Sequence, residues 1–164
     1  MTRTSTFAIA LAALLALAGC AVPEWQEIGT PRAQLLRSLG QPTLVVALAD
    51  GGERLVYSRQ PAGQQVYHME LDAAGRLSSV AQVLTLESFQ ALVPGSDTRE
   101  GVRRRFGPPA LVERVARFDG DVWTYRILDM GEPRLAHVHI DPAGVVRQVI
   151  FTDERRGDPD SRSD

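Results

Sequence analysis

Two stretches of the sequence share one pattern, GTPRAQLLRSLGQP at residues 29–42 and GSDTREGVRRRFGPP at residues 95–109. Each reads as a short helix that ends in Gly-x-Pro, because glycine ends helices in a left-handed conformation and proline prevents their continuation. In the first stretch Thr30 is the expected N-cap and Pro31 the first helical residue. In the second, Asp97 and Glu100 have the spacing of a capping box. The recurrence predicts an internal repeat.

Short alternating segments bounded by turn signals follow both helices. The turn at Asp50-Gly51 corresponds to that at Asp119-Gly120, and a later pair of turns ends at Gly75 and Gly144. Strands are predicted at 43–49, 53–59, 65–71 and 76–83, and again at 110–118, 121–128, 134–140 and 145–151. Each unit is therefore expected to be a short helix, or helix pair, packed on an antiparallel β-meander. The predicted fold class is α+β, in two layers.

Alternation along the strands predicts which side chains are buried. Trp123, Tyr125 and Ile127 share one strand face and are expected to pack against the helices. Leu55 and Tyr57 are their counterparts in the first unit. The opposite face of each sheet is expected to be open to solvent.

The N-terminus has the form of an export signal. Arg3 precedes an apolar run at residues 7–18, which is too short for a membrane-spanning helix but fits a secretory signal. The run ends in Leu17-Ala18-Gly19-Cys20, which resembles the bacterial lipobox, where the cysteine receives a diacylglyceryl group before cleavage. Cys20 is the single cysteine, so it cannot form an internal disulfide, and lipidation explains its presence. By the same resemblance, Ala21 after it favours the outer membrane.

These patterns divide the chain into six segments. They are a lipoprotein signal peptide at 1–19, a lipidated tether at 20–27, a first repeat at 28–84, an apolar linker expected to pack at 85–94, a second repeat at 95–153, and a tail expected to be disordered at 154–164.

The repeated unit resembles a known family. Its pattern is a glycine, a short helix, Gly-x-Pro and a turn leading into an aromatic strand. Residues Gly29 to Pro42 with Tyr57 carry this pattern, and so do Gly95 to Pro109 with residues 119–125, where a turn leads into Trp123 and Tyr125. The sequence is similar here to the BamE/SmpA/OmlA-like outer-membrane lipoproteins, over residues 28–152. Its two units look more like the tandem layout of the secreted β-lactamase inhibitor proteins, which grip an enzyme with the open face of a curved sheet.

Residues suited to catalysis are few. A net charge of −2 gives no electrostatic footprint for nucleic acid. The glycine-rich, nucleophile-elbow and His-Glu-x-x-His motifs are absent, so no enzyme activity, cofactor, metal or small-molecule substrate is predicted. His68, His137 and His139 suggest two alternatives, a zinc site together with Glu70 or polar residues on the open face of a sheet, and we favour the second.

The open sheet face is the candidate partner-binding surface. It is expected to consist of Val56, Ser58, His68, Glu70, Thr124, Arg126, His137 and His139. Substitutions such as Arg126→Glu are then expected to weaken partner binding and leave stability almost unchanged. The predicted function is a lipid-anchored periplasmic module that supports outer-membrane assembly or envelope integrity by binding another envelope protein. The alternative is an inhibitor-like protein that binds a hydrolase through the same face.

Overall fold

The first half of the chain forms one sheet with a helix on it. The computed structural model describes residues 22–154, so the predicted signal peptide, Cys20 and the tail from residue 155 onward lie outside the described residues. The 3₁₀ turn η2 (Pro23–Trp25) and α2 (Arg32–Leu39) are followed by β1 (Leu44–Ala47), β2 (Glu53–Ser58), β3 (Val66–Leu71) and β4 (Leu77–Gln82). The strands pair antiparallel in the order β1-β2-β3-β4.

The second half forms another antiparallel four-stranded sheet. Two short helices come first, α3 (Leu86–Gln90) and α4 (Arg99–Phe106). The strands β5 (Leu111–Glu113), β6 (Asp121–Asp129), β7 (Glu132–Ile140) and β8 (Val146–Asp153) then pair in the order β5-β6-β7-β8. All eight strands fall where alternation predicts them, although β5 is much shorter than expected.

Corresponding residues of the two halves make corresponding bonds. The repeated set comprises the hydrogen bonds from Tyr57 Oη to Gly40 O and from Tyr125 Oη to Gly107 O, both 3.0 Å, and the ion pairs Arg32–Glu53 at 2.6 Å and Arg99–Asp121 at 2.8 Å. In both sheets a bulge interrupts the pairing of the last two strands. Each helix is therefore tied to its own sheet by a tyrosine hydroxyl at one end and an arginine at the other.

The helix ends differ in detail from the expectation. Gly40 and Gly107 have φ of 78° and 72° but ψ near −165°, which is a region open essentially to glycine and not the left-handed helical region. Pro31 and Thr98 are the N-caps, not Thr30 and Asp97. Both N-caps pair as isolated bridges with the residue just before the last strand of their sheet, so each helix begins only after this extended contact.

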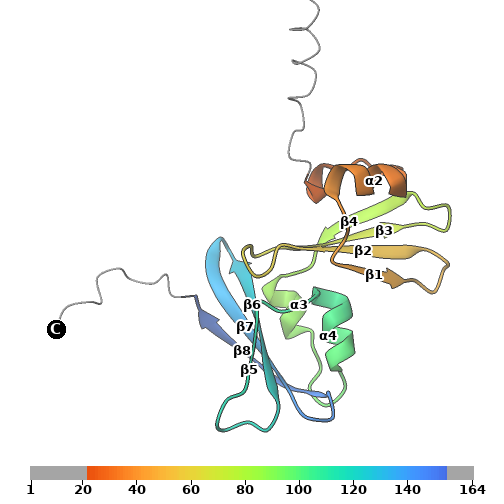
Figure 1. Cartoon of the computed structure of the whole chain (residues 1–164). Coiled ribbons are helices and arrows are strands. Elements are labelled where there is room, and N and C mark those ends of the chain that lie inside the picture. The colour runs from red at the N-terminus through yellow and green to blue at the C-terminus, as the bar shows by residue number, and fades with distance from the viewer. Residues whose placement is uncertain (1–21, 155–164) are drawn as a thin grey trace, which may run out of the picture.

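The elements stack in four layers, two from each half. α2 covers one face of the first sheet, where Leu35, Leu55 and Met69 form a small core. α3 and α4 lie between the other face of this sheet and the second sheet (Figure 1). The side chains of Val56 and Val66 thus share a larger core with those of the second sheet.

Aromatic side chains fill the centre of the larger core. Phe89 of α3 and Phe106 of α4 stack with their ring centroids 4.1 Å apart, and Tyr125 of β6 contacts both rings. Trp123 and Ile127 lie in the same core, as their alternation with Tyr125 predicts. Because Phe89 belongs to the apolar stretch between the repeats, that stretch joins the two halves by packing.

Candidate partner-binding surface

The structure divides the eight predicted surface residues into two groups. Val56, Ser58, His68 and Glu70 lie on the face of the first sheet that α3 and α4 cover. Thr124, Arg126, His137 and His139 lie on the face of the second sheet that points away from both helices, which we call the outer face. The eight residues therefore do not form one surface.

The prediction that Val56 and His68 are exposed is wrong. Val56 has no exposed surface and His68 only 7%, because the second half of the chain packs on this face. The Nε2 atom of His68 lies 2.7 Å from the carbonyl oxygen of Arg105 in α4. Burial, together with the nearby charge of Arg54, lowers the pKa of His68 from 6.5 to about 4. The imidazole is therefore neutral and bonds to α4 as part of the contact between the halves.

Ser58 and Glu70 are also engaged within the chain. Glu70 accepts from both Nε and Nη2 of Arg54, the shorter distance being 2.6 Å. Ser58 receives a backbone hydrogen bond through its Oγ from Gln60. Both residues are half-buried and lie beside the junction of the two halves.

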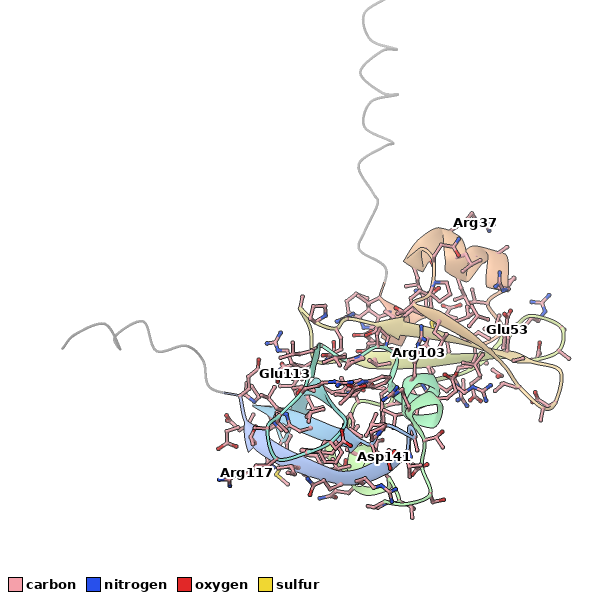
Figure 2. The ribbon with its side chains drawn as sticks, turned by 60° about the horizontal axis from the view of Figure 1, so that its bottom comes forward. Arg37, Glu53, Arg103, Glu113, Arg117 and Asp141 are labelled. Carbon is pink, nitrogen blue, oxygen red and sulfur yellow. The ribbon has the colours of Figure 1, made fainter. Side chains whose placement is uncertain are left out.

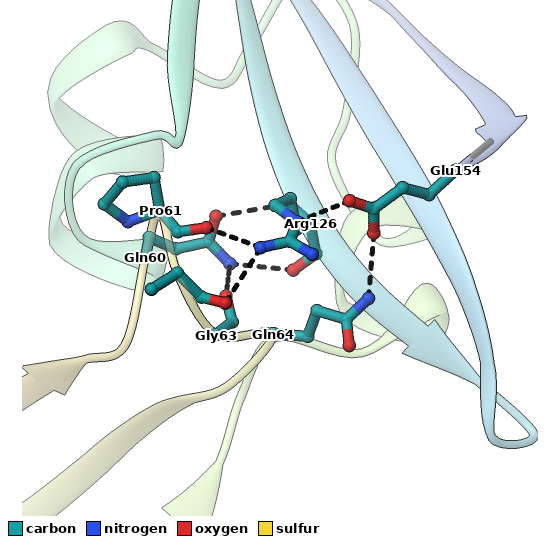
Figure 3. Close-up of polar contacts among 7 residues, drawn as sticks. Gln60, Pro61, Gly63, Gln64, Arg126 and Glu154 are labelled. Atoms are coloured by element: carbon teal, nitrogen blue, oxygen red, sulfur yellow. Dashed lines mark hydrogen bonds and ion pairs between the residues drawn. The ribbon is translucent and has the colours of Figure 1, made fainter. Parts of the chain in front are cut away.

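Arg126 is a structural contact between the halves, so its substitution is now expected to lower stability as well. Its Nη1 donates to the carbonyl oxygens of Pro61 and Ala62, both at 2.8 Å, and its Nε lies 2.6 Å from Glu154 (Figure 3). The Gln60 side chain pairs with both backbone groups of Arg126, accepting from N at 3.2 Å and donating to O at 2.8 Å.

Gln64 completes this group of contacts by donating to Glu154 at 2.9 Å. The β2–β3 loop thereby bonds to β6 beyond the short segment that β5 pairs, Val122 to Thr124. We call residues 60–62, Gln64, Arg126 and Glu154 the Arg126 cluster. It satisfies backbone groups that would otherwise be left at a strand edge.

On the outer face, strand register places one side chain from each strand in a row. The row consists of Leu111, Thr124, His137 and Ile150. Thr124 Oγ1 lies 2.9 Å from His137 Nδ1, and Thr152 Oγ1 of β8 lies 2.9 Å from His137 Nε2. Because a neutral imidazole has one donor and one acceptor nitrogen, the two hydroxyls can satisfy the ring completely.

His139 lies in the neighbouring row and is more deeply covered. It is 8% exposed and Thr124 is 5% exposed, so the prediction that these two residues are open to solvent is also wrong. The Phe118 ring packs edge-on against His139 with a centroid distance of 4.9 Å. Burial lowers the pKa of both His137 and His139, and the charged form of His137 lowers that of His139 further. At neutral pH the outer face therefore has two uncharged imidazoles at its centre.

Partly exposed apolar side chains lie at both edges of the outer face. Leu111 is 50% exposed and Ile150 is 42% exposed, and they flank the Thr124–His137 pair. Neither residue was predicted from the sequence, although the alternation that selected Thr124 and His137 selects them too once the register is known. Glu113 and Arg117 lie near one end of the second sheet, at the opposite end of the molecule from Arg37 of α2 (Figure 2).

The described residues contain neither a metal-binding cluster nor a membrane-spanning helix. No group of three or more His, Cys, Asp or Glu side chains within residues 22–154 is arranged to hold a metal ion. Over the same residues, no helix is long and apolar enough to cross a membrane.

Comparisons with known proteins give only distant likenesses. No family model and no curated protein matches the chain. Among solved structures, the chain is similar to YjgB, a DUF4309 family protein of Bacillus subtilis, with 20% identity, a TM-score of 0.32, and coverage of 76% of this chain and 79% of that one. It is also similar to an extracellular protein containing an SCP domain from Bacillus anthracis, with 14% identity, a TM-score of 0.29, and coverage of 79% and 50%. At these TM-scores the likenesses establish neither a shared fold nor a shared function.

Proposed function

We propose that this chain is a non-catalytic lipoprotein that is anchored through Cys20, faces the periplasm from the outer membrane, and supports outer-membrane assembly or envelope integrity by binding another envelope protein. The lipobox-like segment ending at Cys20 supports export and anchoring. The outer face of the second sheet is the observation that carries the binding role. It combines half-exposed Leu111 and Ile150 with His137, an uncharged polar side chain whose hydrogen bonds are made within the chain, a mixture suited to a protein partner.

A non-catalytic role is consistent with the chemistry of this face. Two threonine hydroxyls lie 2.9 Å from the His137 ring, that of Thr124, which is 5% exposed, and that of Thr152. Both hydrogen-bonding sites of the His137 ring already have partners within the chain. The same face has no basic cluster for nucleic acid.

We also propose that the chain consists of two tandem copies of one α+β unit, each a helix on an antiparallel meander, similar to the unit of the BamE-like lipoproteins. The paired tyrosine and arginine contacts of the two halves support a duplication. In the second copy no helix covers the outer face, and in the first copy the equivalent face is covered by α3 and α4.

Site-specific photo-crosslinking in living cells tests the binding role. A crosslinking residue at Ile150 is expected to capture one defined envelope protein, and His137→Glu in the same chain is expected to reduce the yield. The matched control places the crosslinker at Ala33, an exposed position on α2, where no such product is expected. Equal products from both positions would refute the assignment of this face.

The alternative function, inhibition of a hydrolase, has the same observation in its favour, since an open sheet face also suits an enzyme surface. The identity of the captured protein distinguishes the two. An assembly or structural protein of the envelope supports the first proposal. An enzyme whose turnover falls when the purified chain is added, and recovers with His137→Glu, supports the second.

A further inference from the structure

Two large apolar side chains are exposed in the segment that leads into α2. Trp25 is 77% exposed and Ile28 is 64% exposed. Single apolar residues on a surface are ordinary, but a tryptophan contributes much of its stabilising effect through burial of about 150–250 Å². Exposure of Trp25 close to a second large apolar side chain indicates a contact that the isolated chain leaves unmade.

The backbone of this segment is fixed, so the two side chains are held in place. Pro23 is buried, and η2 packs against β3 and β4. The backbone N–H of Trp25 donates to Val22 O at 3.2 Å. Gly29 N donates to Leu77 O at 2.7 Å, immediately after Ile28. A docked turn that points its largest apolar side chain outward presents that side chain with little loss of conformational entropy on binding.

The sequence places this turn close to the proposed lipid anchor. Trp25 follows Cys20 by only five residues, which span at most about 18 Å when fully extended. Acyl chains on Cys20 enter the hydrocarbon core, so Cys20 itself lies in the polar headgroup layer, which is roughly 5–8 Å thick on each side. Tryptophan is enriched at this depth because its ring is apolar and its N–H remains hydrated.

We infer that Trp25 and Ile28 insert into the headgroup region of the bilayer that holds Cys20 and thereby fix the orientation of the folded domain on the membrane. The inference rests on the lipid anchoring in the proposed function. A lipid anchor at Cys20 alone would let the domain rotate freely. Insertion of Trp25 and Ile28 adds a second point of attachment, which holds the turn that carries Trp25 against the bilayer.

The charges around the turn indicate what kind of lipid surface is involved. Glu24 faces Arg59 at 3.6 Å, and the neighbouring Glu27 is exposed. This turn therefore has no excess of basic charge that would favour anionic lipids. Insertion depends on apolar area, so it is expected in uncharged membranes and is expected to change little with salt.

Tryptophan fluorescence of the lipidated full-length protein in phosphatidylcholine vesicles tests the inference. The chain has two tryptophans, and Trp123 is buried, so the difference between wild type and Trp25→Phe isolates Trp25 without disturbing the core. In vesicles the Trp25 signal is expected to move to shorter wavelength and its acrylamide quenching constant to fall about twofold or more, relative to soluble Cys20→Ser. In the matched control, Leu111→Trp in the Trp25→Phe background, the new tryptophan is expected to stay accessible to acrylamide.

Intact-mass analysis and vesicle flotation distinguish failure of the lipid anchor from failure of Trp25 insertion. If the protein is acylated and floats with the vesicles, and Trp25 is still quenched as strongly as in Cys20→Ser, the insertion is refuted and the anchor stands. If Cys20 carries no acyl chains, both the anchor and the insertion are refuted. Protection that disappears at high salt would contradict insertion driven by apolar area.

Discussion

Replacement of Arg126 by glutamate should destabilise the fold, although strand alternation places this residue on an open face. The wild-type guanidinium donates to Pro61 O and Ala62 O and pairs with Glu154 at 2.6 Å. Arg126 and Glu154 are 31% and 19% exposed, so solvent screens the pair only in part. Arg126→Gln is expected to cost about 1–2 kcal/mol, and Arg126→Glu, which places like charges together, about 2–4 kcal/mol.

Urea unfolding followed by circular dichroism measures this effect. The midpoint is expected to fall with the m-value unchanged. The matched control is Arg104→Glu on α4, because Arg104 is 62% exposed and its ion pair with Glu100 is 3.4 Å long; this change should cost no more than about 1 kcal/mol. Adding Glu154→Arg to Arg126→Glu should recover part of the loss. If Arg126→Glu unfolds at the same urea concentration as wild type, the Arg126 cluster does not hold the two halves together.

Three further predictions follow from buried groups. The pKa of His68 is about 4 in the folded chain and 6.5 in the unfolded chain. Its contribution to the free energy of unfolding should therefore be fully present above pH 6.5 and decrease by about 2–3 kcal/mol as the pH falls to 4. His68→Gln should flatten this part of the pH profile of the melting temperature, and an unchanged slope would contradict the assignment. Trp123→Ala should cost about 3–5 kcal/mol in chemical denaturation as a core truncation, and a loss below about 1 kcal/mol would place Trp123 outside the core. Tyr125→Phe should cost about 1–2 kcal/mol in the same assay, because it leaves a buried carbonyl unpaired. The equivalent bond of Tyr57 is exposed, so Tyr57→Phe should cost less than half as much, and equal losses would contradict this difference in burial.

The parts of the fold that local patterns specify could be predicted from the sequence. Alternation with a period of two and the Asp-Gly turns locate the strands, and the shared face of Trp123, Tyr125 and Ile127 is correct. These features depend on neighbours in the chain. The order of the layers depends on which sheet face the second half covers, and no local pattern states this directly.

One signal for the covered face was nevertheless present. β2 places Val56 directly after Leu55, and β1 adds Leu44 and Val46 on the same face as Val56. Near-continuous apolar strands are typical of sheets that are buried on both faces. The assumption that every meander keeps one face open to solvent therefore led to the wrong exposure for Val56 and His68. The Arg126 cluster gives no comparable signal, because Gln60 and Arg126 lie far apart in the sequence and meet only when the halves pack.

Cysteine labelling in intact envelopes tests most directly whether the outer face of the second sheet is the free, partner-binding surface. Under the proposed function the lipid occupies the thiol of Cys20, so each introduced cysteine reports alone. Ile150→Cys is expected to react with a thiol reagent in the purified protein and to be protected in the envelope. Ala33→Cys on α2 should react in both, and Val56→Cys in neither. Equal labelling of Ile150→Cys in the envelope and in purified protein, or rapid labelling of Val56→Cys in the folded chain, would contradict the account.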